Sequence, residues 1–303
     1  MELGMIGLGK MGGFMVERLV RGGHRIIGLD RDPAAVARVV EKGATGAESI
    51  DKLSGQLKAP RAIWIMVPSG KPVDDTIDQL LPHLSPGDTI IDGGNSYYRD
   101  SVRRGAALAP KKINFVDCGT SGGVWGLTEG YSMMVGGDAE VVKRLAPIFQ
   151  TLAPGPEKGW GRVGPTGAGH YVKMVHNGIE YAIMQAYAEG LDLFRHKTEF
   201  GLDLLQITKI WQYGSVVRSW LLDLTVDALS KNPTLDGIEA FVTDSGEGRW
   251  TAMEGIEHGV PLPALTGALD ARFRSQDPQP FANKLLAMMR HEFGGHAVKT
   301  ATK

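Results

Sequence analysis

The chain has 303 residues, of which 43% are hydrophobic and 22% charged, and its formal net charge is −1; this composition suits a globular protein with room for two domains and gives no electrostatic reason to expect a nucleic acid or a membrane surface as partner. The single cysteine, Cys118, excludes an internal disulfide and a multi-cysteine metal site, and it suits a reducing compartment. Because the sequence has no apolar run of 18 residues and its first residues lack the basic start of a signal peptide, we expect a cytoplasmic protein without a membrane span.

A glycine-rich turn follows the first predicted strand, residues 3–8. Residues Gly7 to Gly12 match G-x-G-x-x-G and run into an amphipathic helix. In dinucleotide-binding domains the first glycine permits the tight turn, the second lets the backbone approach a pyrophosphate, and the third lets the helix pack on the strand. Because a strand precedes this motif and a helix follows it, we expect the loop to bind a dinucleotide.

The second predicted strand, residues 25–30, ends in an acid. Asp30 lies 18 residues past Gly12, near the spacing of the carboxylate that binds the adenosine ribose. A carboxylate here favours NAD, because it would repel the 2′-phosphate of NADP. Arg31 follows at once and could bind that phosphate instead. Asp30 ends the strand itself, so we favour NAD and keep NADP as the alternative.

Strands and helices continue to alternate up to about residue 165. This pattern predicts an α/β fold, a Rossmann-type doubly wound parallel sheet, whose ligands bind at the carboxyl ends of the strands. Loops at Pro68-Ser69, Gly93–Ser96 and Ser121–Gly123 follow strands, so we expect them to gather beside the glycine loop. The predicted strands are 62–67, 89–92, 113–118 and 131–135, and the predicted helices are 32–42, 72–82 and 138–150.

A Gly- and Pro-rich stretch, residues 153–169, contains one last short strand and then the predicted domain boundary. We expect a dinucleotide-binding domain at 1–166. No strand–helix alternation follows, so residues 167–303 should form an all-helical domain for substrate binding and oligomerisation, built on one long core helix and ending in a polar tail. Its predicted helices are 170–196, 203–211, 219–229, 264–275 and 281–293, with loops at 212–218 and 231–249.

The long helix carries four polar side chains, Lys173, His176, Asn177 and Glu180. At about 100° per residue they lie at roughly 0°, −60°, +40° and −20° around the helix axis, so they form one stripe. Most of their neighbours are apolar, and buried charges need partners. A structural ion-pair network or a bound ligand could supply those partners. The cofactor loops of the first domain favour the ligand.

Five short motifs are spread over essentially the whole chain. Together they resemble the motifs of the decarboxylating 6-phosphogluconate dehydrogenases, in their short-chain form, within the wider β-hydroxyacid dehydrogenase family. The narrower assignment rests on Asp92–Ser96, on His176-Asn177-x-x-Glu180-Tyr181 and on the tail. The motifs are Gly7–Gly12, Asp92–Ser96, Ser121–Gly123, Gly167-x-Gly169-x-x-x-Lys173-x-x-x-Asn177 and Arg290–His296.

The resemblance implies oxidative decarboxylation of 6-phosphogluconate to ribulose 5-phosphate and CO2, a reaction of the pentose phosphate pathway, with hydride transfer to a nicotinamide cofactor. Lys173 would be the general base for the 3-hydroxyl proton, a role that needs a neutral amine, which burial favours. After CO2 has left, Glu180 would protonate the carbon that becomes C1 of ribulose 5-phosphate. The two backbones lie about 10 Å apart along the helix, so both side chains can reach one sugar acid. No metal is implied, because the ketone formed at C3 activates the carboxylate.

The resemblance also implies how the substrate and the cofactor are held. Arg290 and His296 would reach the site from a neighbouring subunit, which implies a homo-oligomer, a dimer or a tetramer, with a shared active site. Where the family often has lysine this chain has Arg249, whose guanidinium still suits a phosphate. The substrate-binding set is Asn95, Ser121, Gly122, Gly123, His176, Asn177, Tyr181, Arg249, Thr251, Arg272, Arg290 and His296. The cofactor-binding set is Gly7, Leu8, Gly9, Lys10, Met11, Gly12, Asp30, Arg31, Val67, Pro68, Lys71 and Asn95.

Two alternatives remain open. A related β-hydroxyacid dehydrogenase for a small unphosphorylated acid such as 3-hydroxyisobutyrate would keep Lys173 and Asn177, but it would need neither Glu180 nor the arginines. A dinucleotide-binding sensor without turnover would be expected to lack the pair of Lys173 and Glu180, which is intact in this chain.

Overall fold

The computed structural model describes residues 1–300, which divide into two compact units. The first unit spans Met1–His176 and the second begins at Asn177. Helix α8 (Ala168–His196) runs through that division, so it belongs to both units. The boundary after residue 166 that the sequence favours stays a prediction.

The first unit is built on an eight-stranded sheet with the strand order β3-β2-β1-β4-β5-β6-β7-β8. All neighbouring strands run parallel except β6 and β7. The strand order reverses between β1 and β4, which is where doubly wound sheets bind their ligands. The predicted Rossmann-type fold is therefore confirmed. The strands are β1 (Glu2–Ile6), β2 (Arg25–Leu29), β3 (Thr45–Gly46), β4 (Ala62–Ile65), β5 (Thr89–Asp92), β6 (Asn114–Ser121), β7 (Ser132–Gly136) and β8 (Trp160–Gly164).

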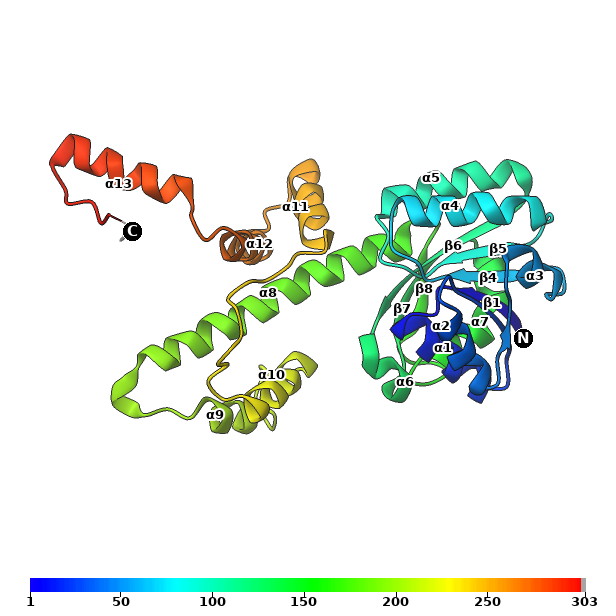
Figure 1. The fold of residues 1–303 in the computed structure, drawn as a ribbon, viewed down its shortest axis with the longest axis horizontal. Coiled ribbons are helices and arrows are strands. Elements are labelled where there is room, and N and C mark those ends of the chain that lie inside the picture. The colour runs from blue at the N-terminus through cyan, green and yellow to red at the C-terminus, as the bar shows by residue number, and fades with distance from the viewer. Residues whose placement is uncertain (301–303) are drawn as a thin grey trace. The chain divides into compact units, whose positions relative to one another are not determined.

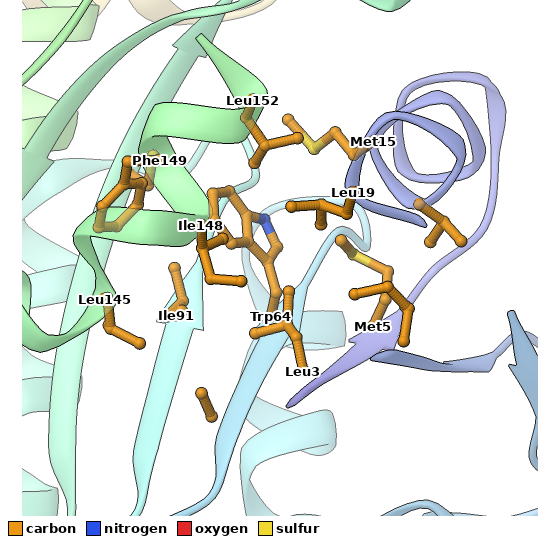
Figure 2. Packing of buried hydrophobic residues seen from close by; sticks show 14 of the residues in the cluster. Leu3, Met5, Met15, Leu19, Trp64, Ile91, Leu145, Ile148, Phe149 and Leu152 are labelled. Atoms are coloured by element: carbon orange, nitrogen blue, oxygen red, sulfur yellow. The ribbon is translucent and has the colours of Figure 1, made fainter. Parts of the chain in front are cut away.

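Helices cover both faces of this sheet (Figure 1). On one face, α1, α2 and α7 pack over a core centred on Trp64, whose side chain is fully buried and contacts Phe149 at 5.9 Å between ring centres. Figure 2 shows Met15 and Leu19 of α1 and Leu152 of α7 around this indole. A second core under α3, α4 and α5 covers the other face. The helices are α1 (Lys10–Arg21), α2 (Pro33–Glu41), α3 (Ile50–Gly55), α4 (Lys71–Leu80), α5 (Tyr98–Leu108), α6 (Gly126–Glu129) and α7 (Ala139–Leu152), with 3₁₀ turns η1 (Leu81–His83), η2 (Ala109–Lys111) and η3 (Gly123–Trp125).

Two features of the sheet differ from the sequence-based expectation. Strand β6 continues to Ser121, so this residue ends a strand and does not lie in a loop. Strand β7 pairs antiparallel with β6, with Ser121 opposite Ser132. The link between them holds only η3 and the four-residue α6, and this is too short for the crossover that a parallel neighbour needs.

Over its described residues, 177–300, the second unit has only helices as regular structure, as predicted. Helix α11 begins at Glu247, inside the predicted loop 231–249. Its pattern is hard to detect because it contains Gly248 and Gly255, and glycine is a poor helix former. A Cβ atom on Gly248 would lie 2.6 Å from the ring of Tyr181, so packing requires this glycine. The elements are the second half of α8, η4 (Thr198–Phe200), α9 (Leu204–Trp211), α10 (Trp220–Lys231), α11 (Glu247–His258), α12 (Pro263–Gln276) and α13 (Phe281–Gly294).

Within residues 1–300, no helix has both the length and the apolar character needed to cross a lipid bilayer. Helix α13 differs from the others in its surroundings, because none of its residues 281–294 is buried. Its large apolar side chains are 45–78% exposed. They are Phe281, Leu285, Leu286, Met288, Met289 and Phe293.

Candidate active site

The glycine loop after β1 has the geometry of a pyrophosphate-binding turn. Gly7 has φ +95°, and a Cβ atom on it would lie 2.4 Å from the carbonyl oxygen of Met66. A Cβ atom on Gly12 would lie 2.0 Å from the carbonyl oxygen of Gly7, whereas one on Gly9 would meet no atom within 4 Å. The first and third glycines are therefore required by close packing, and the second leaves open backbone for a ligand.

A cavity of about 840 Å³ lies at the carboxyl ends of β1, β2 and β4. Six predicted cofactor residues line it: Gly7, Gly9, Asp30, Arg31, Val67 and Pro68. Among the other predicted residues, Lys10, Met11 and Gly12 belong to the first turns of α1. Lys71 begins α4, where its exposed ammonium pairs with Asp75. The cavity thus has the position and size for the adenosine half of a dinucleotide.

Two carboxylates line this cavity. Asp30 accepts hydrogen bonds from the backbone nitrogens of Leu8 at 2.5 Å and Asp32 at 2.9 Å, so its carboxylate is fixed beside the glycine loop. Glu48 also lines the cavity, together with the basic Arg31. Glu48 could not be predicted from the sequence, because the strand before it, β3, has only two residues.

The start of helix α8 is anchored to the sheet. The buried carboxylate of Asp117 on β6 accepts hydrogen bonds from the backbone nitrogens of Gly167 at 2.6 Å and His170 at 2.8 Å. A Cβ atom on Gly169 would lie 2.5 Å from the carbonyl oxygens of both Asp117 and Met134. These contacts explain the Gly167-x-Gly169 spacing, because α8 meets β6 and β7 backbone to backbone. Sequence reasoning did not find Asp117.

Lys173 lies one turn further along α8 and also packs on β6. Its side chain is 7% exposed. A Cβ atom on Gly119 would lie 2.3 Å from the Cβ atom of Lys173, so this glycine makes room for the lysine. The ammonium nitrogen lies 3.4 Å from Nδ1 of His176. Lys173 is thus held at the end of β6 that leads to Ser121.

The predicted polar stripe is present on α8. Lys173, His176, Asn177 and Glu180 all lie within this helix, and the last three are half-buried. Seven residues separate Lys173 from Glu180, which places their backbones about 10 Å apart along the axis.

The loop after β5 is tightly bonded at its base. The buried carboxylate of Asp92 accepts hydrogen bonds from the nitrogen of Gly94 at 3.1 Å and the hydroxyl of Ser96 at 2.8 Å. Asn95 lies between these two residues and is exposed. The loop therefore presents Asn95 to solvent from a fixed frame. The turn after β6 places Gly122 at φ +128° and Gly123 at φ +51°, a conformation that favours glycine.

In the second unit, Tyr181 and Arg272 form the centre of a polar cluster. The guanidinium carbon of Arg272 lies 3.6 Å from the centre of the Tyr181 ring, and its Nη1 donates to the carbonyl of Thr243 at 2.7 Å. The backbone nitrogen of Ser245 donates to the Tyr181 hydroxyl at 3.3 Å, and the Ser245 hydroxyl donates to Glu247 at 2.6 Å. Ser245 and Glu247 were not predicted, because only the contact of Ser245 with the distant Tyr181, and the bond of Ser245 to Glu247, distinguish them.

Two of the other predicted phosphate residues, Arg249 and Thr251, are bonded within the chain, and two lie exposed at its C-terminal end. The Nε of Arg249 donates to the carboxylate of Asp244 at 3.0 Å. The buried hydroxyl of Thr251 donates to the carbonyl of Glu247 at 2.8 Å. Arg290 lies on α13 and His296 just after it, and both are exposed. Their part in phosphate binding stays a prediction.

Comparisons with known proteins agree with this arrangement. Residues 2–163 match the model of the NAD binding domain of 6-phosphogluconate dehydrogenase, and residues 169–301 match that of the 6-phosphogluconate dehydrogenase C-terminal domain. The chain is 42% identical over 299 residues, 98% of both chains, to the NAD(+)-dependent, decarboxylating 6-phosphogluconate dehydrogenase of Haloferax volcanii. It is 40% identical over 287 residues to the decarboxylating enzyme of Candida albicans, covering 89% of this chain and 55% of that one.

Solved structures share the fold of this chain. The Plasmodium falciparum 6-phosphogluconate dehydrogenase, studied with its cofactor NADP+ and with 6-phosphogluconate, aligns with a TM-score of 0.84 and 29% identity over 100% of this chain and 67% of that one. The 3-hydroxyisobutyrate dehydrogenase of Mycobacterium tuberculosis shares the fold, with a TM-score of 0.72 and 22% identity over 91% of this chain and 94% of that one. Because both family models match and the Haloferax volcanii relative is similar over nearly its full length, the chain belongs to the 6-phosphogluconate dehydrogenase family.

Proposed function

We propose that the protein converts 6-phosphogluconate and a nicotinamide dinucleotide into ribulose 5-phosphate, CO2 and the reduced dinucleotide. The observation that carries this proposal is the polar stripe of α8, which places Lys173 against β6 and Glu180 seven residues further along one helix. The names of the relatives from Haloferax volcanii and Candida albicans support the same reaction.

The residues of the first unit fit a dinucleotide. Open backbone at Gly9, the fixed carboxylate of Asp30 and the cavity wall at Val67 would hold the pyrophosphate, the adenosine ribose and the base. When bound, the nicotinamide accepts a hydride from C3 of the substrate. Lys10, Met11 and Asn95 would flank the nicotinamide end of the dinucleotide.

Lys173 acts first, on the 3-hydroxyl. Its neutral amine takes the hydroxyl proton as the C3–H bond breaks, which leaves a ketone at C3. The ammonium so formed donates a hydrogen bond to this ketone. The C1–C2 bond then breaks and CO2 leaves, the electron pair forms the C2–C3 double bond, and Lys173 returns its proton to the C3 oxygen. The product of this step is an enediol.

Glu180 completes the reaction. Its carboxyl group protonates the carbon that has lost CO2, and Lys173 takes back the proton of the C3 hydroxyl as the ketone of ribulose 5-phosphate forms. Lys173 ends protonated and Glu180 deprotonated, so one proton passes from the amine to the carboxylate before the next turnover. The separation of about 10 Å suits two proton transfers at different carbons. Asn95, Ser121, His176 and Asn177 would bind the carboxylate and the hydroxyls.

The cluster in the second unit suits the phosphate of the substrate. The Tyr181 hydroxyl accepts a hydrogen bond from the backbone nitrogen of Ser245 and lies 3.4 Å from the Ser245 hydroxyl, and its proton would turn from that hydroxyl to a phosphate oxygen. Arg272 stacks on the same ring and supplies a positive charge. A guanidinium beside a phenol is a strong donor set for a phosphate monoester. Arg249 would join after exchanging its bond to Asp244.

We further propose that NAD is preferred over NADP. Asp30 and Glu48 give the adenosine cavity two carboxylates beside the one guanidinium of Arg31. The net charge of these three side chains is negative, which opposes binding of the 2′-phosphate of NADP. The Haloferax volcanii relative, named as NAD(+)-dependent, supports this preference.

We also propose a homo-oligomer, a dimer or a tetramer, in which α13 packs on another copy. Its exposed apolar side chains need cover, and Arg290 and His296 would reach the site of that copy. Mixing inactive Lys173→Met and Arg290→Ala subunits tests this idea. Subunit exchange should restore activity, because some sites then combine an intact Lys173 with an intact Arg290. A mixture that stays inactive although exchange is demonstrated would contradict the shared site.

The single cysteine supports a reducing, cytoplasmic location.

Substrate choice tests the reaction. Purified protein is given 6-phosphogluconate, gluconate or 3-hydroxyisobutyrate, each with NAD, and reduced nicotinamide is followed by absorbance. We expect a kcat/KM for 6-phosphogluconate at least about 1,000 times that for gluconate. Gluconate lacks the phosphate, so Arg272 and Tyr181 would lose their binding partner. Faster turnover of 3-hydroxyisobutyrate would instead identify a plain β-hydroxyacid dehydrogenase.

A further inference from the structure

A buried arginine on α5, Arg104, belongs to neither the predicted substrate-binding set nor the predicted cofactor-binding set. The side chain of Arg104 is 2% exposed, and all three of its guanidinium nitrogens donate hydrogen bonds. Its Nε donates to Asp74 on α4 at 2.7 Å, and its Nη1 donates to Asp92 at the end of β5 at 3.2 Å. A buried guanidinium is costly to desolvate, and the bonds of all three nitrogens offset that cost.

Two further partners of Arg104 lie in loops. Its Nη2 donates to the carbonyl of Gly70 at 3.0 Å, in the turn that joins β4 to α4. Its Nη1 also reaches the hydroxyl of Ser96 at 3.4 Å, in the loop after β5. One planar group therefore ties the Val67–Gly70 turn to the Gly93–Ser96 loop.

These loops are in contact at a second point. A Cβ atom on Gly94 would lie 3.1 Å from the carbonyl oxygen of Val67, and one on Gly93 would lie 2.0 Å from Nε1 of Trp64. The loop after β5 thus packs against β4 and the chain just after it, and Arg104 donates hydrogen bonds to Asp92 and Ser96 at its two ends. Asn95 lies in the middle of this loop, exposed between two bonded neighbours.

We propose that Arg104 is a positioning residue for the reaction: its guanidinium fixes the Gly93–Ser96 loop against the Val67–Gly70 turn and so sets where Asn95 meets the cofactor and the substrate. This inference rests on the proposed binding role of Asn95. A lysine could keep the charge but not the planar fork that reaches Asp74, Gly70 and Asp92 together.

The neighbouring arginine provides a matched control. Arg103 also pairs with Asp74, at 3.0 Å, and with Asp100 at 3.2 Å, but it is 55% exposed and both partners lie on α4 and α5. Arg103→Gln removes a partner of the same carboxylate without loosening either loop. Its kinetic constants should remain within about twofold of the wild type.

A double-mutant cycle separates positioning from general stability. Arg104→Lys, Asn95→Ala and the double variant are compared for kcat/KM with 6-phosphogluconate and for the NADH dissociation constant, measured by nicotinamide fluorescence. In the wild-type background Arg104→Lys should lower kcat/KM about tenfold and raise the NADH dissociation constant about tenfold. In the Asn95→Ala background the same change should alter both constants less than twofold, because the side chain that Arg104 positions is already absent.

Two results would overturn the inference: an equal loss in both backgrounds, or wild-type constants for Arg104→Lys. If Arg104→Lys does not fold, Ser96→Ala loosens the same loop with a smaller change and should show about a threefold loss that disappears with Asn95→Ala. A wild-type protein that binds NADH but turns over no 6-phosphogluconate would refute the proposed function, and the NADH dissociation constants would still decide the role of Arg104.

Discussion

Gly119 on β6 lies so close to Lys173 on α8 that a Cβ atom on the glycine would be 2.3 Å from the Cβ atom of the lysine. The same glycine Cβ would lie 2.8 Å from the carbonyl oxygen of Gly169. The helix that carries the proposed base therefore rests on the sheet at a point where no side chain fits. The position of Lys173 depends on this contact as well as on its own sequence.

Gly119→Ala should displace α8 and lower both kcat and the stability of the fold. Overpacking at a buried contact costs about 1–3 kcal/mol, whereas a shift of about 1 Å at a catalytic group lowers kcat on the order of 100-fold. The measurement is kcat together with the thermal midpoint of unfolding. Gly161→Ala is the control, because a Cβ atom there would meet nothing within 4 Å. Normal kcat in Gly119→Ala would show that the contact does not place Lys173.

Asp117→Ala should have a similar kinetic effect through the start of α8. Removing the carboxylate leaves the nitrogens of Gly167 and His170 without their acceptor, which should cost about 2 kcal/mol. Asp138→Ala removes a comparable cap from α7, where Asp138 accepts from Glu140 and Val141. Both variants should lose stability in denaturant titrations, but only Asp117→Ala should lower kcat/KM, by about tenfold or more. Equal kcat/KM values in the two variants would contradict the anchoring role.

Asp30→Ser should shift the cofactor preference towards NADP. The change removes the carboxylate that opposes the 2′-phosphate, while Arg31 stays in the cavity. We expect the ratio of kcat/KM for NADP to that for NAD to rise at least about tenfold, with a smaller rise for Glu48→Gln. Glu41→Gln, an exposed acid of α2, is the control. An unchanged ratio in Asp30→Ser would mean that this residue does not face the ribose.

Asp74 should link the two arginines of α5 to stability in acid. Although partial burial favours its protonated form, hydrogen bonds from Arg104 and Arg103 hold the pKa of Asp74 below its ordinary value of 3.8. The folded state therefore binds fewer protons here, so the stabilisation is present above pH 3.8 and is lost as the pH falls below it.

Asp74→Asn should accordingly lower the free energy of unfolding at pH 7 by on the order of 1 kcal/mol, discounted because a third of the side chain is exposed. The difference from the wild type should shrink in denaturant titrations as the pH falls below 3.8. Asp75→Asn, which breaks only an exposed pair with Lys71, should change stability by less than about 0.5 kcal/mol. A difference for Asp74→Asn that does not depend on pH would rule out this linkage.

Features that are local in sequence could be predicted. The turn at Gly7 and Gly12, the acid at the end of β2 and the stripe of α8 each depend on residues within a few turns or one strand–helix unit. Backbone geometry alone then places them correctly. The same is true of the alternation that predicts the Rossmann-type sheet.

Features that depend on distant contacts could not be predicted. Asp117 meets Gly167 across 50 residues, and Ser245 meets Tyr181 across 64. Glu48 follows a strand too short to show a pattern. Helix α11 was missed because its glycines, required by packing against Tyr181 and Leu262, weaken its helical signal.

The most direct test of the account is the burst of reduced nicotinamide in the first turnover with 6-phosphogluconate and NAD, compared between Lys173→Met and Glu180→Gln. Lys173→Met should show no burst, because the 3-hydroxyl proton has no base to accept it. Glu180→Gln should keep the burst and lose steady-state formation of ribulose 5-phosphate, because only the last proton transfer is blocked. A near-normal burst in Lys173→Met would contradict the assignment of Lys173 as the base and the division of labour along α8.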